Sequence, residues 1–249
     1  MHRFFLAPEQ CGGPILELSG REAHHALQVL RIRRGELVQV LDGAGQVLSC
    51  KMHTCDRRRV QLEVIEREVA PPRAYGVTLL QGLPKGKLID AIIQKSTELG
   101  AERIVPLLTE RVVVHLDGEE ASAKAERWRG LAVEAVKQCG SAWLPQVEPP
   151  APFTQWLDCD KAELRLFGLL APEACHPRQH FLAFRRQHQR LPRSVSAWIG
   201  PEGDFSPAEI GELKSAGVLP ITLGPLVLRT ETAAVYCLSF INYELQAPP

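Results

Sequence analysis

Two glycine turns carry the residue types best suited to holding a ligand. The first, Gly200–Asp204 with the sequence GPEGD, follows the apolar segment 195–199. The second, Leu223–Leu228, also follows an apolar segment, and each turn leads into a predicted helix. Because glycine has no side chain, a ligand can come close to the backbone amides of such turns. The alternative for the first turn is that its glycines only permit a tight strand-to-helix connection.

Arg229 and Glu231, at the start of the helix after the second turn, are the candidate catalytic side chains. A guanidinium stabilises negative charge that develops on a substrate, or it holds a phosphate. Arg229 could instead form an ion pair with Glu231 or Glu202 that joins the two turns. The Glu231 carboxylate could accept a proton or cap the helix that follows. The sequence leaves these alternatives open.

Alternating strands and helices place both turns at one edge of a sheet. Between residues 73 and 249, strand-like apolar segments lie at 77–80, 103–108, 164–170, 195–199 and 218–223. Apolar spacing predicts helices over 88–99 and 123–139, and helices follow the last two strands. This alternation is typical of a mainly parallel sheet covered on both faces. We expect the last two strands to be neighbours, so that their turns form one cleft where open α/β sheets bind ligands.

Two local features complete this half of the chain. Ser206, Pro207 and Glu209 have the spacing of a capping box with proline at the first helical position. The segment 171–193 has the least regular pattern, with at most a short helix around Phe181–Phe184.

The first 72 residues have a different pattern. Strand-like segments at 14–18, 37–41, 46–52 and 59–65, with one helix over 22–30, predict a small β-barrel. Pro71 and Pro72 then remove two backbone donors and fix two φ angles, which indicates a linker. We therefore predict two domains, 1–72 and 73–249.

Composition limits the location and partners that we expect. Lys and Arg number 29, as do Asp and Glu, so net charge gives no argument for binding nucleic acid or a membrane surface. No apolar run approaches the roughly 18 residues that cross a bilayer, and the first residues lack a signal-peptide pattern. We expect a cytoplasmic protein with no membrane partner. The seven cysteines and eight histidines lack metal-ligand spacing, so we expect no metal.

Several motifs, in order along nearly the whole chain, resemble those of the RsmE family. They are HHALQVLR at 24–31, KGK at 85–87, QKSTELG at 94–100, TER at 109–111, GPEGDFS at 200–206 and LGPLVLRTETA at 223–233. Members of this family belong to the SPOUT superfamily and methylate N3 of a uridine, position 1498, in 16S ribosomal RNA. The resemblance implies the same reaction here, with S-adenosylmethionine as methyl donor and the 16S rRNA of the small subunit as partner.

The resemblance also implies a fold and an assembly. It implies an α/β domain with a SPOUT-type parallel sheet and a deep trefoil knot, preceded by a PUA-like RNA-binding β-barrel. It further implies a homodimer with its active site near the subunit interface. General rules of chain topology count against a knot, so this expectation rests on the family alone.

Site residues follow from the motifs. Arg229 and Glu231 are expected to be catalytic. Cofactor contacts are expected from Leu80, Gly200, Pro201, Glu202, Gly203, Leu223, Gly224, Leu228, Thr230, Thr232 and Ala233. RNA contacts are expected from the basic residues Arg3, Arg31, Arg33, Lys85 and Lys87, while Arg57, Arg58 and Arg59 are left open.

Two positions depart from the family pattern, and two rival functions remain. Asp204 replaces the last glycine of the usual GPEGG, and Ser141 stands where an arginine is common after Gln-x-Gly. One rival is a non-catalytic RNA-binding or ribosome assembly factor of the same fold. The other is a nucleotide hydrolase, which lacks support because GPEGD has no Gly-Lys-Ser/Thr ending and no metal-binding aspartate follows.

Overall fold

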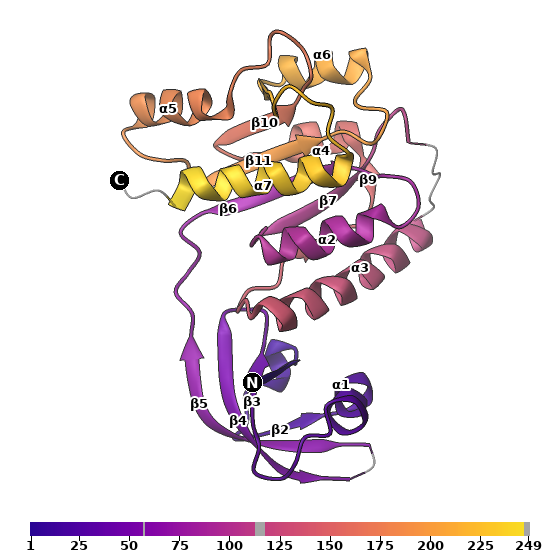
Figure 1. The fold of residues 1–249 in the computed structure, drawn as a ribbon, viewed down its shortest axis with the longest axis vertical. Helices are drawn as coiled ribbons and strands as arrows, with labels where there is room; N and C mark the ends of the chain where they lie inside the picture. The colour runs from indigo at the N-terminus through magenta and orange to yellow at the C-terminus, as the bar shows by residue number, and fades with distance from the viewer. Residues whose placement is uncertain (57, 113–117, 247–249) are drawn as a thin grey trace. The chain divides into compact units, whose positions relative to one another are not determined.

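The computed structural model describes residues 1–56, 58–112 and 118–246, which form two compact units. The N-terminal unit comprises Met1–Pro72 together with Val133–Leu144. The C-terminal unit comprises Arg73–Ala132 and the described residues from Pro145 onward; Figure 1 traces both along the chain. The predicted first domain, 1–72, thus lacks a segment that the structure groups with it.

Backbone hydrogen bonds attach Val133–Leu144 to the N-terminal unit. The amide of Leu144 donates to the Gly43 carbonyl over 2.9 Å, and the amide of Gly45 donates to the Ala142 carbonyl over 3.0 Å. The Trp143 ring covers Gly45 so closely that a Cβ added there would stand 2.6 Å from it. Pro71 and Pro72 indicate where the strand pattern of the first domain ends, but they do not predict that residues 133–144 pack against that domain.

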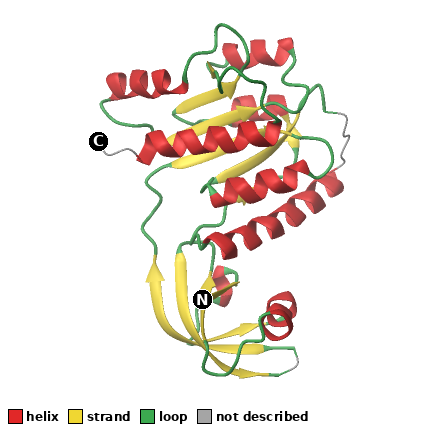
Figure 2. Cartoon of the chain, in the orientation of Figure 1, coloured by secondary structure: helices red, strands yellow, loops and turns green. Residues whose placement is uncertain are grey.

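The strands of the N-terminal unit form one five-stranded sheet. Figure 2 colours them yellow. They are β1 (His2–Phe5), β2 (Ile15–Leu18), β3 (Leu37–Leu41), β4 (Gln46–Cys55) and β5 (Val60–Val69). Their order is β1-β3-β4-β5-β2, with β1 parallel to β3 and the other neighbours antiparallel. Strands β2 to β5 confirm the sequence prediction, whereas β1 has no counterpart in it. In the described residues β1 and β2 are the two edge strands and do not pair with each other, so the sheet does not close into the predicted barrel.

Alternating residues of these strands form the core of the N-terminal unit. Val38 and Val40 on β3 are fully buried, and Phe4 on β1 is fully buried beside them. The predicted helix over 22–30 is α1 (Gly20–His24) continued by the π-helical turn η2 (His25–Val29), and the 3₁₀ turn η1 (Pro8–Gln10) precedes both.

The C-terminal unit contains a parallel sheet of seven strands. They are β6 (Gly76–Gly82), β7 (Arg103–Leu108), β8 (Gln146–Val147), β9 (Ala151–Pro152), β10 (Leu164–Gly168), β11 (Ser194–Ile199) and β12 (Leu219–Ile221). The order is β12-β10-β11-β6-β7-β8, with β9 paired to β7, and every pair is parallel. The alternation of strands and helices predicted a mainly parallel sheet, and Val105, Phe167 and Trp198 within it are fully buried.

Helices connect and cover these strands. They are α2 (Leu88–Glu98), α3 (Gly118–Cys139), α4 (Phe153–Cys159), α5 (Pro177–His188), α6 (Pro207–Ser215) and α7 (Thr230–Gln246). Helices α2 and α7 contact each other, and α7 lies against β6 and β11 (Figure 1). The segment predicted as irregular contains α5, a regular helix with Pro177 at its start and the His176 ring accepting from the Arg178 amide. Within the described residues no helix combines the length and apolar character that a membrane crossing requires.

Candidate functional site

A cavity of about 520 Å³ opens where three parallel strands of the C-terminal unit end. Its walls come from the turns after β10, β11 and β12, from the first residues of α7 and from Leu88 of α2. Carboxyl ends of parallel strands meet at one edge of a sheet, which is where ligands of open α/β sheets bind. Both glycine turns singled out in the sequence therefore line one space.

The strands that lead into these two turns are not neighbours, contrary to the sequence prediction. Strand β10 lies between them and pairs with β11 on one side and β12 on the other. Gly168, Leu169 and Leu170, where β10 ends, therefore form part of the cavity wall. Strand order depends on contacts across the sheet, and consecutive apolar segments in a sequence do not reveal it.

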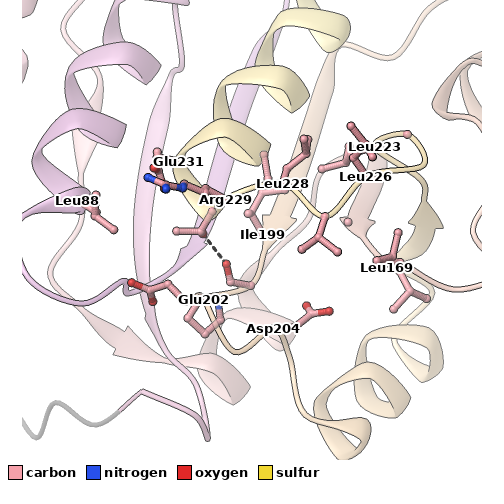
Figure 3. Close-up of a pocket in the computed structure, with 18 residues that line it drawn as sticks. Leu88, Leu169, Ile199, Glu202, Asp204, Leu223, Leu226, Leu228, Arg229 and Glu231 are labelled. Atoms are coloured by element: carbon pink, nitrogen blue, oxygen red, sulfur yellow. Dashed lines mark hydrogen bonds between the residues drawn. The ribbon is translucent and has the colours of Figure 1, made fainter.

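The cavity has an apolar side and a polar side (Figure 3). Leu169, Leu223 and Leu226 lie on the first, while Arg229, Glu231 and Glu202 lie toward Leu88. Apolar walls with few polar groups are typical of sites that hold the flat rings of a cofactor. The polar side offers one guanidinium and two carboxylates for a second, more polar ligand.

Neither structural alternative for Arg229 and Glu231 is present among the described residues. Arg229 is exposed and forms no ion pair there with Glu231 or Glu202, and the half-buried Glu231 accepts no hydrogen bond from the start of α7. Both side chains are therefore free to meet a ligand in the cavity.

Thr230 connects the turn after β11 to the start of α7. Its hydroxyl donates to the Gly200 carbonyl over 2.7 Å, drawn as a dashed line in Figure 3, and accepts from Gln81 Nε2 over 2.8 Å. Gln81 on β6 is fully buried, and its amide nitrogen also donates to the Gly82 carbonyl. Two sides of the cavity are thus held together by buried hydrogen bonds.

The first turn packs against the end of β6 at van der Waals limits. A Cβ added to Gly82 would stand 2.5 Å from Cδ and 2.6 Å from the backbone nitrogen of Pro201. Contacts that short do not occur in proteins, so only glycine at position 82 lets the turn lie where it does. The position of the turn therefore depends on its contact with Gly82 of β6 and on its hydrogen bond with Thr230.

The predicted capping box at the start of α6 is confirmed. The Ser206 hydroxyl accepts from the Glu209 amide, and Glu209 Oε2 accepts from the Ser206 amide over 2.8 Å. Glu209 Oε1 also accepts from the amide of Glu110 over 2.8 Å, and Glu209 is buried, with 6% of its surface exposed. One buried carboxylate thereby fixes both the helix start and the loop after β7.

Asp204 occupies a backbone conformation that favours glycine. Its φ is 61°, in the left-handed region, and its Oδ1 accepts from the Phe205 amide over 2.8 Å. Asp and Asn enter this region more readily than other residues because their short polar side chains bond the local backbone. The left-handed φ also explains why glycine is usual at this place in the family. Asp204, in addition, contributes a carboxylate to the cavity wall.

Most of the predicted site residues line this cavity, but not all. The candidate catalytic Arg229 and Glu231 do so, as do Gly200, Pro201, Glu202, Leu223, Gly224, Leu228, Thr230 and Ala233. Leu80, Gly203 and Thr232 do not: Leu80 is fully buried in the sheet, Thr232 is exposed on α7, and Gly203 lines a separate cavity with Lys85. Lining residues without a sequence prediction include Leu88, Leu170, Ile199 and Val227. Of these, Val227 lies inside a quoted motif and could have been found.

The predicted RNA contacts lie in both units. Arg31 and Arg33 are exposed in the N-terminal unit, as are Lys85 and Lys87 in the C-terminal unit. Arg3 is only half-exposed, and its guanidinium donates to Gln39 and to the carbonyls of residues 137 and 138. Arg58 and Arg59 lie beside Arg57, which is outside the described residues.

The fold and cavity define the class of protein, and comparison with known proteins agrees. Residues 71–242 match the family model described as an RNA methyltransferase domain, and residues 18–65 match that of an RNA methyltransferase PUA domain. This is an RNA methyltransferase fold with an N-terminal PUA domain.

Relatives narrow the class to one family. Ribosomal RNA small subunit methyltransferase E of Bacillus subtilis is 34% identical, over 99% of this chain and 98% of its own length. The protein of that name from Synechocystis is 32% identical, over 99% and 78%. The chain therefore belongs to the family of ribosomal RNA small subunit methyltransferases E, and the resemblance to RsmE proteins is confirmed.

Solved structures are similar over almost the whole chain. A structure from Legionella pneumophila, in complex with the bound cofactor S-adenosylmethionine, has a TM-score of 0.87 and 31% identity, with 97% of this chain and 96% of that one covered. A ribosomal RNA small subunit methyltransferase E from Neisseria gonorrhoeae, bound to S-adenosylmethionine, has a TM-score of 0.85 and 26% identity, with 98% and 97% covered.

Proposed function

We propose that this chain transfers a methyl group from S-adenosylmethionine to N3 of a uridine, position 1498, in 16S rRNA of the small ribosomal subunit. The observation that carries the proposal is the cavity between the two glycine turns, with Arg229 and Glu231 on its polar side. Family membership supports the reaction class. The names of the relatives support the small-subunit RNA, and two similar structures that hold S-adenosylmethionine support the cofactor.

The residues of the cavity fit S-adenosylmethionine. A volume of about 520 Å³ lies within the usual range for cofactor sites, roughly 300–1,000 Å³. Leu169, Leu223 and Leu226 offer an apolar surface for the adenine ring. Gly224 has a φ of 105°, and a Cβ added there would meet no protein atom within 4 Å, so its bare backbone borders the space that a ligand would fill.

The protein's own contribution to the reaction is alignment and removal of a proton. When bound, S-adenosylmethionine supplies an electrophilic methyl group on a sulfonium. A uracil must present N3 without its proton, so the site must accept that proton and stabilise the negative charge on the ring. Arg229 is placed to stabilise the charge, and Glu231, beside it on the polar side, is the candidate proton acceptor. Positioning of the two reactants should supply most of the rate enhancement. The hydrogen bonds of Thr230 with Gly200 and Gln81, which fix the cavity wall, are consistent with that role.

The N-terminal unit, which contains the PUA domain, is proposed to bind the RNA. Exposed Arg31 and Arg33 there, and Lys85 and Lys87 near the cavity, are proposed phosphate contacts. Arg3 is a weaker candidate for an RNA contact, because its guanidinium already donates hydrogen bonds to Gln39 and to two carbonyls of its own unit.

The family further supports a deep trefoil knot in the C-terminal unit, a homodimer and a place in the cytoplasm, where ribosomal subunits are assembled. Leu226 and Val227, 73% and 83% exposed at the rim of the cavity, are apolar side chains that a second subunit would cover. Sedimentation equilibrium tests the dimer, since a purely monomeric protein would contradict it.

The decisive experiment uses small ribosomal subunits that lack the modification, with free 16S RNA in parallel and a methyl-labelled cofactor. We expect label on one uridine, at N3, identified by nuclease digestion and mass spectrometry. Label on another base would overturn the substrate. Cofactor binding by calorimetry without any transfer would favour the non-catalytic RNA-binding factor, and binding of a nucleoside triphosphate instead would favour a hydrolase.

A further inference from the structure

A second cavity, of about 280 Å³, shares part of its wall with the cofactor cavity. Pro201 and Glu202 line both. The second cavity is completed by Leu83, Pro84, Lys85, Arg111, Val112 and Gly203. The methyl donor is assigned to the first cavity, and no particular group has been assigned to the second, although Lys85 in its wall is a proposed phosphate contact.

Two cations from different loops line this second cavity. Lys85 lies between β6 and α2, and Arg111 lies after β7. Among the described residues the Lys85 ammonium has no hydrogen-bond or ion-pair partner, and the Arg111 guanidinium uses Nη1 to bind the Gly203 carbonyl. A guanidinium has five donors, so one carbonyl does not exhaust it. Among the described residues that line this cavity, Glu202 is the one carboxylate.

Both loops are attached to the turn that separates the two cavities. The backbone amide of Lys85 donates to Glu202 Oε1 over 2.9 Å, and Arg111 binds Gly203 in the same turn. The backbone of Lys85 and the guanidinium of Arg111 are therefore attached to one turn, which also carries Glu202 on the polar side of the cofactor cavity (Figure 3).

The ligand that fits must carry a negative charge and tolerate apolar walls. Leu83, Pro84 and Val112 present apolar surface, while Arg111 can fork a phosphate and Lys85 can serve as a point charge. Because Pro201 and Glu202 line both cavities, an RNA strand whose target base enters the polar side of the first would bring a neighbouring phosphate close to the second. We propose that the second cavity holds the phosphate of a nucleotide adjacent to the target uridine, with Lys85 and Arg111 as its counter-charges. The inference rests on the proposed function.

Kinetics on unmodified small subunits test this assignment. Lys85→Gln should raise the KM for the subunit by roughly tenfold, as expected for a lost charge-assisted contact, with kcat within about twofold of wild type. Arg111→Lys should retain more of the affinity than Arg111→Gln, because it keeps the charge but loses the fork. The salt dependence of RNA binding should fall by about one unit of log–log slope in Lys85→Gln. Calorimetry should give an unchanged Kd for S-adenosylmethionine.

Lys161→Gln is the matched control, because Lys161 is exposed in the same unit and lines neither cavity. A rise in KM for Lys161→Gln equal to that for Lys85→Gln would overturn the proposal, as would no rise for Lys85→Gln. Loss of cofactor binding in Lys85→Gln would assign the residue to the wall of the first cavity instead. If wild type transfers no methyl group, the proposed function fails separately, and filter binding of 16S RNA still tests the cavity: equal affinities for wild type and Lys85→Gln would contradict it.

Discussion

The hydroxyl of Thr230 donates to the carbonyl of Gly200 over 2.7 Å, and this bond joins the first residue of α7 to the turn after β11. The same hydroxyl accepts from the buried amide of Gln81. Two segments that border the cofactor cavity therefore share one buried oxygen atom. Their relative position therefore depends on the hydroxyl of one side chain, which itself lines the cavity.

Thr230→Val should disturb stability and cofactor binding together. Valine has the same shape but leaves the Gln81 amide without its side-chain acceptor, which costs about 1–3 kcal/mol for a buried donor. Urea unfolding measures the stability, and calorimetry measures the Kd of S-adenosylmethionine, which we expect to rise. Thr230→Ser keeps the hydroxyl and is the control. An equal loss in both variants would show that the methyl group, and not the hydrogen bonds, is what matters.

Arg229→Ala should reduce methyl transfer far more than stability. The side chain is exposed at the polar side of the cavity and forms no ion pair with Glu231 or Glu202 among the described residues, so folding should lose less than about 0.5 kcal/mol. Loss of a preorganised charge at the acceptor should lower kcat by roughly 100-fold or more. Arg229→Lys should recover part of that loss. If Arg229→Ala kept the wild-type kcat, Arg229 would have no part in the mechanism.

Gly82→Ala should displace the first turn. The new Cβ would stand 2.5 Å from Pro201 Cδ, and the nearest atoms include backbone, which cannot rotate away. We expect a weaker affinity for S-adenosylmethionine, together with a loss of stability of about 1–3 kcal/mol from overpacking. Gly130→Ala in α3 is the control, since its Cβ meets nothing within 4 Å and helix propensity favours alanine. Wild-type cofactor affinity in Gly82→Ala would show that the turn adapts.

Asp204 tests why the family usually has glycine at this place. Asp204→Ala should cost about 1–2 kcal/mol, because alanine pays the left-handed φ of 61° without the bond to the Phe205 amide. Asp204→Gly should retain the fold with a smaller loss, and any change in cofactor affinity would then report the carboxylate alone. Thermal unfolding of the two variants makes the comparison. Equal stability of both would mean that backbone strain is unimportant here.

Local signals account for the parts of the site that the sequence predicts. The capping box at Ser206 and Glu209 involves neighbouring residues, and the two glycine turns follow apolar strands, so spacing alone finds them. The positive φ of Asp204 could also have been predicted, since it stands where the family has glycine. These features depend on residues only a few positions apart.

Long-range contacts account for what the sequence does not predict. The place of β10 between β11 and β12 depends on pairing across the sheet. The same is true of the link from Thr230 to Gln81, which are 149 positions apart, and of the return of Val133–Leu144 to the N-terminal unit. None of these has a signature in the residues themselves, because each arises only when distant segments meet.

The two oxygens of Glu209 bind amides from segments that are far apart in the chain, at Ser206 and at Glu110. The bond to Ser206 lies within the first turn of α6, so the helix can form it by itself, whereas the other carboxylate oxygen gains its amide partner only when the loop after β7 lies against the helix. Because Glu209 is buried, opening of that loop would leave one oxygen without its partner, so the loop and the start of α6 stabilise each other.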